Sequence, residues 1–134
     1  MTTAGSDDKL DKAIALGADL AVNYRAEDVA ARAREWTRGA GIDVIIDPVG
    51  AGVWRGNLDA IRRGGRMVCC GFTVGALVEL DLGEWLNKKI SVIGSGSIGA
   101  KREMMEVLTA VERGAYVPVV SAVHDRLDVF AAHD

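Results

Sequence analysis

The chain has 134 residues, of which 49% are hydrophobic and 26% are charged, and its formal net charge is −3. This length allows one domain with a sizeable core, and the acidic balance argues against a nucleic-acid partner, which would require a basic surface. No apolar run reaches the roughly 18 residues of a membrane-spanning helix, and the N-terminal residues have no basic or apolar segment typical of a signal peptide. Cys69 and Cys70 are adjacent and cannot form a disulfide framework, so we expect a cytoplasmic protein.

The first forty residues contain two short pairs of strand and helix. Thr2–Ala4 is predicted to be the end of a strand, and a helix follows with Ser6 as its N-cap and Gly17 beyond its end. Ala21–Tyr24 is predicted to be a short strand, and residues 26–38 a helix with apolar residues along one face.

Three apolar strands are predicted in the middle of the chain, at Ile42–Asp47, Met67–Gly71 and Ile90–Ser95. Strands of this composition are typical of parallel sheets that helices cover on both faces. A helix lined by Trp54, Leu58 and Ile61 is predicted between the first two strands, and Gly64–Gly65 is predicted to stop it. The helical spacing of Trp36, Trp54 and Trp85 predicts that all three are packing residues.

The last part of the chain continues this alternation. A short helical stretch is predicted at 84–88. A helix that ends at Gly114 is predicted from the apolar stripe of Met104, Val107, Leu108 and Val111. An extended segment is predicted at 117–124, followed by the start of another helix after Asp125. Strands that alternate with helices over short connections predict an α/β fold with a parallel sheet and right-handed crossovers.

Several segments, in their order and spacing, carry a resemblance to a known family. They are Gly5–Leu10, Leu16–Asp19, Val22–Arg25, Asp43–Gly50, Gly64–Val68 and Ser91–Ser95. Together they resemble the nucleotide-binding domain of the medium-chain dehydrogenase/reductase superfamily, which includes zinc-type alcohol dehydrogenases and quinone oxidoreductases. The resemblance implies a partial Rossmann-like parallel sheet with flanking helices, taken from the strand order 3-2-1-4-5-6.

In that order the chain begins at the end of the second strand. The resemblance therefore implies that the first strand and its glycine-rich loop are lacking, together with the catalytic domain that precedes them. We expect residues 1–116 to be the C-terminal part of a dinucleotide-binding domain, and residues 117–134 to begin the return to the catalytic domain. The chain would then be an internal fragment or a truncated product.

The same resemblance implies an NAD(P)-dependent oxidoreductase that moves a hydride between nicotinamide and a carbonyl or alcohol, a quinone or an enone. NADP is the expected cofactor and NAD the alternative, while zinc, if any, would be bound by the absent catalytic domain. A homo-oligomer through the sheet edge near residues 90–95 is also implied. The alternative function is a catalytically inactive remnant, or an association module without cofactor.

The cofactor contacts that the resemblance implies begin at the end of the first strand. Ser6, Lys9, Tyr24 and Arg25 would hold the 2′-phosphate of NADP. NAD-binding relatives carry an acid near this point, which binds the ribose hydroxyls, and Ala4-Gly5-Ser6 has none. The two aspartates that follow oppose a phosphate by local repulsion, and a plain helix cap with solvated charges is the alternative interpretation.

Further contacts are implied at the ends of the next strands. Val49 and Gly50 would lie beside the adenine and ribose, and Cys70, Gly71, Phe72 and Ser95 near the nicotinamide. The alternatives are a tight turn that requires Gly50 for positive φ, and buried structural thiols at Cys69 and Cys70. No catalytic residue and no metal ligand is predicted, and His124 and His133 have no partner ligands at metal-binding spacing.

The segment Gly94–Gly99 matches G-x-G-x-x-G, the dinucleotide fingerprint. A fingerprint opens a mononucleotide-binding half with about two further strands, and only residues 100–134 follow it here. The resemblance instead implies a turn after the sixth strand. We therefore do not expect this segment to bind a pyrophosphate.

Overall fold

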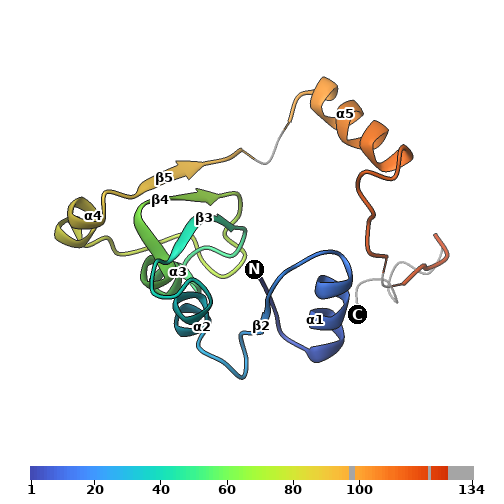
Figure 1. Cartoon of the computed structure of the whole chain (residues 1–134). Coiled ribbons are helices and arrows are strands. Elements are labelled where there is room, and N and C mark those ends of the chain that lie inside the picture. The colour runs from blue at the N-terminus through green and yellow to red at the C-terminus, as the bar shows by residue number, and fades with distance from the viewer. Residues whose placement is uncertain (97–98, 121, 127–134) are drawn as a thin grey trace. The chain divides into compact units, whose positions relative to one another are not determined.

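A computed structural model describes residues 1–96, 99–120 and 122–126 (Figure 1). It has two compact units, Met1–Ser97 and Ile98–Asp134. The elements of the first unit are β1 (Thr2–Ala4), α1 (Asp7–Ala15), β2 (Ala21–Asn23), α2 (Val29–Trp36), β3 (Ile42–Asp47), α3 (Trp54–Ala60), β4 (Ile61–Cys69), α4 (Leu82–Lys88) and β5 (Ser91–Gly94). The second unit contains α5 (Lys101–Glu112). No helix in the described ranges is long and apolar enough to cross a bilayer.

The strands of the first unit form two separate parallel sheets. One has the order β1-β2 and the other the order β3-β4-β5. This confirms the predicted α/β class, with parallel sheets flanked by helices. The two orders are those that remain when strand 1 is taken out of 3-2-1-4-5-6, and β1 and β3 are not paired with each other.

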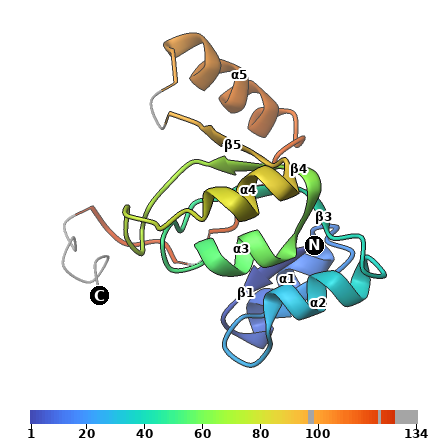
Figure 2. The ribbon, with the colours of Figure 1, turned by 90° about the vertical axis from the view of Figure 1, so that its left-hand side faces the viewer.

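The larger sheet is covered on one face by α3 and α4, which can be followed in Figure 2. The buried cluster there consists of Leu58, Ile61, Met67 and Ile90, and the Trp54 and Trp85 rings pack against it. Both tryptophans are therefore core residues, as their spacing predicts. Trp36 was expected to pack in the same way, but its side chain at the end of α2 is exposed, so that prediction is wrong.

A second buried cluster joins α2 to the larger sheet. It consists of Ala30, Ala33 and Ala60, and Met1, Ile42 and Ile45 pack against it. Small side chains let the helices approach closely, so α2 lies against α3. The start of β1 and the start of β3 thus pack against the same buried apolar cluster.

The junction between α3 and β4 corrects the sequence prediction. Ile61 does not line the helix but is the first residue of β4, and Gly64–Gly65 lies inside this strand instead of ending the helix. The pairing with β3 is irregular here, passing from Ile42↔Ile61 to Val44↔Arg66. Gly64 takes φ +73° in this irregular part, and a Cβ on Gly65 would lie 2.6 Å from the Ile61 side chain. Glycines serve both as bulge residues and as helix ends, so the sequence signal was ambiguous.

Other boundaries also differ from the prediction. The second helix begins at Val29 instead of residue 26, because the Asp28 carboxylate caps it by accepting the Ala31 N–H at 3.0 Å. In the segment expected to be extended at 117–124, the described residues 117–120 and 122–124 form no strand. The helix predicted after Asp125 falls at 127–134, outside the described residues, and the domain boundary at 116/117 stays a prediction.

Candidate functional site

Apart from Lys9, which lies in α1, the predicted contact residues of the first unit lie at or just beyond the carboxyl ends of strands. Ser6 follows β1, Tyr24 follows β2, Val49 follows β3, Cys70 follows β4 and Ser95 follows β5. Ligands of open α/β sheets bind at these ends. The structure gathers the residues into two groups, one for each sheet.

The first group is built around Gly5, the residue after β1. A Cβ at this position would lie 2.6 Å from Tyr24 Oη and 3.1 Å from Arg25 Nε, so both side chains rest against the Gly5 backbone. The backbone hydrogen bonds between β1 and β2 continue as far as Gly5, because the Tyr24 N–H donates to the Ala4 carbonyl at 3.1 Å. The Tyr24 side chain remains 55% exposed overall.

Asp7 and Asp8, at the start of α1, accept hydrogen bonds from polar side chains beside this group. Ser6 occupies the N-cap position but makes no side-chain cap hydrogen bond; its hydroxyl donates to Asp8 Oδ1 at 2.5 Å. This hydrogen bond lowers the pKa of Asp8. Asp7 accepts a hydrogen bond from Asn23 Nδ2 at 3.1 Å. The Ser6 hydroxyl would therefore have to turn away from Asp8 before it could donate to a bound anion.

Lys9 lies in the first turn of α1 and is exposed. Its N–H donates to the Ser6 carbonyl at 3.2 Å, so the backbone of this lysine lies close to the end of β1. The predicted set of Ser6, Lys9, Tyr24 and Arg25 is thus brought to one end of the smaller sheet. A hydroxyl, a phenol and two cations at the start of a helix fit a phosphate group chemically.

The second group is organised by Asp47, the last residue of β3, which is only 2% exposed. Its Oδ1 accepts the N–H groups of Val49 and Gly50 at 2.8 and 3.0 Å, and its Oδ2 accepts Asn57 Nδ2 at 3.0 Å. The buried carboxylate is thus held by three donors. Sequence reasoning missed its role, although an aspartate two residues before a turn is a known turn-forming signal.

The loops after β3 and β4 meet backbone to backbone. Gly50 has φ +83°, and a Cβ there would lie 2.4 Å from the Gly75 carbonyl oxygen. A Cβ on Gly71 would lie 2.5 Å from the Pro48 carbonyl oxygen, and the Val74 N–H donates to the Val49 carbonyl at 2.9 Å. These two glycines are therefore required for the close approach that brings both loops together.

Other predicted residues border this second group. The Cys70 N–H donates to the Asp47 carbonyl, and the Ser95 N–H to the Cys69 carbonyl, both at 2.9 Å. Phe72 follows Gly71 and its side chain is exposed. Cys69 packs against the core cluster, where burial raises the pKa of its thiol. Among the described residues no three His, Cys, Asp or Glu side chains gather as a metal site requires.

The G-x-G-x-x-G match is only partly described. Gly94 ends β5, and a Cβ on Gly96 would meet nothing within 4 Å. Ser97 and Ile98 lie outside the described residues, so the expectation that this segment binds no pyrophosphate stays a prediction. His133 also lies outside the described residues, whereas His124 is described and its side chain is exposed.

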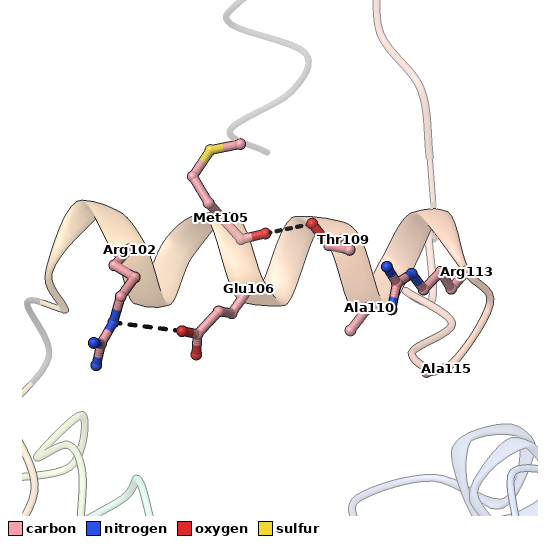
Figure 3. Close-up of a pocket in the computed structure, with 7 residues that line it drawn as sticks. All are labelled: Arg102, Met105, Glu106, Thr109, Ala110, Arg113 and Ala115. Carbon is pink, nitrogen blue, oxygen red and sulfur yellow. Dashed lines mark hydrogen bonds and ion pairs between the residues drawn. The ribbon is translucent and has the colours of Figure 1, made fainter.

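A shallow hollow lies along α5 in the second unit (Figure 3). Three of its polar side chains have partners: Arg102 pairs with Glu106 at 3.4 Å, and the Thr109 hydroxyl donates to the Met105 carbonyl at 2.9 Å. An exposed helix face of this kind does not indicate a binding site.

Comparisons with known proteins agree with this geometry. The family profile described as zinc-binding dehydrogenase matches residues 1–113. Quinone oxidoreductase 1 of Escherichia coli is 39% identical over 90 residues, which is 67% of this chain and 27% of that protein. The chain therefore spans about a quarter of that relative's length.

Two solved structures extend the comparison. An NAD-dependent alcohol dehydrogenase is similar with a TM-score of 0.77 and 37% identity, over 87% of this chain and 34% of that one. E. coli quinone oxidoreductase in complex with NADPH gives a TM-score of 0.76 and 30% identity, over 89% of this chain and 39% of that one. The profile covers most of the chain, and the chain belongs to the zinc-binding dehydrogenase family of oxidoreductases.

Proposed function

We propose that these residues form the NADP-binding part of an oxidoreductase. The whole protein would move a hydride between nicotinamide and a carbonyl or alcohol, a quinone or an enone. The observation that carries the cofactor choice is the packing of Tyr24 and Arg25 against Gly5. The similarity to a quinone oxidoreductase solved with NADPH supports it, while the NAD-dependent relative keeps NAD as the alternative.

The chemistry at Gly5 favours a 2′-phosphate over two free ribose hydroxyls. Dinucleotide folds that prefer NAD place an acid near this position, whereas an arginine nearby accommodates the 2′-phosphate of NADP. A side chain at Gly5 would collide with the Tyr24 ring, so no acid can replace this glycine without displacing Tyr24. Arg25, Lys9 and the Tyr24 hydroxyl then remain as donors to the phosphate.

The second group would hold the rest of the cofactor. Val49 and Gly50 are fixed by Asp47 and would line the adenine and ribose, and Cys70, Gly71, Phe72 and Ser95 would lie toward the nicotinamide. The bound nicotinamide supplies the hydride, and the protein orients it. In this proposal the proton-transfer groups and any zinc ligands belong to the part of the protein outside these residues.

Nucleotide titrations of the chain test the cofactor choice. We expect 2′,5′-ADP to shift the amide signals of Ser6, Tyr24 and Arg25 at millimolar concentration, and 5′-ADP to shift them much less. The chain alone should bind weakly and show no dehydrogenase activity. Equal shifts with both nucleotides would remove the NADP assignment, and none with either would favour an inactive remnant or association module.

The open edge of β5 is the proposed contact for a homo-oligomer. Within the described part of the chain β5 pairs only with β4, and all four of its residues are exposed. Sedimentation measures the association of the wild type and of the Ile93→Lys variant, and we expect the variant to associate more weakly. Equal association of the two proteins would place the contact elsewhere.

A further inference from the structure

A hollow of about 450 Å³, which we call the basic hollow, lies at the amino ends of β3 and β4. Its lining includes Arg34 on α2, residues 39–41 just before β3, Arg62 and Arg63 near the start of β4, and Lys88 at the end of α4. Both groups of the candidate cofactor site lie at the opposite, carboxyl ends of the strands. The basic hollow is therefore a separate place in the first unit.

Close packing of the backbone brings the end of α2 to the start of β4. Gly41 has φ +85°, and a Cβ there would lie 2.9 Å from both the Ala60 carbonyl oxygen and the Arg62 backbone nitrogen. The Arg34 guanidinium donates to the Asp59 carbonyl at 3.0 Å. Arginines that are far apart in the sequence thus line the same hollow.

The basic hollow carries an excess of positive charge. Three of the cations in and beside it are matched by three carboxylates, in the ion pairs Arg62–Asp43, Arg55–Asp59 and Lys88–Glu84. The guanidinium groups of Arg34 and Arg63 are left, and neither has a carboxylate partner in the part of the chain that the structure describes. Two uncompensated positive charges in one hollow, in a chain whose net charge is −3, indicate a site for an anion.

Capping of a helix explains some of these cations but not Arg63. Arg34 and Lys88 donate to carbonyls in the last turn of α3, where positive charge is favourable. The Arg63 side chain is exposed, and among the described residues it has no hydrogen bond and no ion pair. It lies in the irregular part of β4, outside the regular pairing with β3. All the N–H donors of its guanidinium are therefore available to a ligand.

From these observations we infer that the basic hollow binds the dianionic phosphate group of a small molecule, with Arg34 and Arg63 as its counterions. A guanidinium presents paired N–H donors that match the oxygens of a phosphate. Two free cations also match the charge of roughly −2 that a phosphate monoester carries at neutral pH. The volume is typical of a small-molecule site, so the hollow can hold more than the phosphate itself. This inference does not rest on the proposed cofactor.

Methyl phosphate and dimethyl phosphate are the probes, because at neutral pH the first is largely a dianion and the second a monoanion. At constant ionic strength, we expect methyl phosphate to give saturable shifts of the Gly41, Arg62 and Arg63 amide signals, and dimethyl phosphate to bind at least roughly tenfold more weakly. Equal binding of the two, no saturable shift, or shifts confined to the residues around Gly5 would overturn the inference.

Inorganic phosphate, as a third probe, distinguishes the two sources of this chemistry. An affinity equal to or higher than that of methyl phosphate would identify free phosphate as the ligand. A lower affinity would identify a phosphate monoester, whose organic part then contributes to binding. Both outcomes support a phosphate site in the basic hollow.

Variants of three arginines localise the binding. Arg63→Gln removes an exposed charge that has no partner among the described residues, so the fold should be kept while methyl phosphate binds roughly tenfold more weakly. Arg34→Gln should weaken it by a similar factor. Arg66→Gln is the matched control and should change nothing, because Arg66 is also an exposed arginine of β4 but does not line the hollow. An unchanged affinity in Arg34→Gln or Arg63→Gln, or an equal loss in Arg66→Gln, would overturn the inference.

Discussion

At the scale of single residues, the candidate site depends on side chains that hold the backbone in place. The resemblance identified Ser6, Tyr24 and Arg25, and the structure brings them to the same end of the β1-β2 sheet. The resemblance did not identify Asp47, whose hydrogen bonds include one from Asn57, ten residues further along the chain. Such a contact depends on the packing of α3 against β3, which local sequence patterns do not encode.

Lys9 is expected to contribute to the binding of 2′-phosphates. A charge-assisted hydrogen bond is worth ~1.5–3 kcal/mol, so Lys9→Ala should weaken 2′,5′-ADP roughly tenfold or more, with little effect on 5′-ADP. Lys12→Ala, on the same helix and 3.9 Å from Asp8, is the control and should change neither. Calorimetry measures both affinities, and an equal loss for the two nucleotides would contradict the assignment.

Asp47 is expected to determine the stability of the turn at Val49–Gly50. Asp47→Ala leaves the donors of Val49, Gly50 and Asn57 without their acceptor, at a cost of ~1–3 kcal/mol for each donor that stays buried. Asp47→Asn should recover the two turn contacts but oppose the Asn57 amide. The double variant Asp47→Asn/Asn57→Asp restores a donor–acceptor pair and should be more stable than Asp47→Asn. Urea unfolding compares them, and no recovery in the double variant would contradict this role.

At the scale of elements, the presence of the central strands was easier to predict than the residues at which the elements begin and end. β3 was predicted at its observed bounds because its apolar run is flanked by clear turn residues. The α3–β4 junction was not, because Gly64–Gly65 serves a bulge instead of a helix end. What distinguishes the two is the tight space around Gly65, which only the folded chain provides.

The contact between α3 and α4 predicts a dependence of stability on pH. Hydrogen bonds from Arg55 and then Lys88 lower the pKa of Glu84 from its ordinary 4.5 to about 2. Because the pKa of Glu84 is lower in the folded state than in the unfolded state, this carboxylate stabilises the native state when the pH is above the unfolded-state pKa. That contribution is lost as the pH falls from about 4.5 to about 2. Glu84→Gln should reduce this acid-side loss, as measured by urea midpoints across that range. Glu79→Gln, on the preceding loop, should keep the wild-type slope, and an unchanged slope in Glu84→Gln would contradict the prediction.

At the scale of the whole molecule, the division into two sheets affects how protection should be distributed. The lack of the first strand, which the sequence resemblance implies, predicts protection between residues 42 and 112 and loose docking of residues 1–40. α2 lies in that first part, yet it shares a buried cluster with Ala60, so we now expect its amides to be protected with the larger sheet.

Hydrogen exchange tests this distribution. We expect slow exchange in α2, β3 and β4, where most contacts and buried side chains lie, and fast exchange in β1, α1 and β2, whose sheet has only two short strands. Uniform protection from Thr2 onward in a monomer would contradict it.

The direct passage from α3 into β4 also limits how the length of this sequence can vary. Ala60 ends the helix and Ile61 begins the strand with no connecting residue between them. A one-residue insertion there would exchange the two faces of β4 and turn Met67 away from the core, unless the bulge before Arg66 absorbed it. Related sequences should therefore keep a constant spacing from Leu58 to Met67, and place their insertions and deletions in the loop before α4.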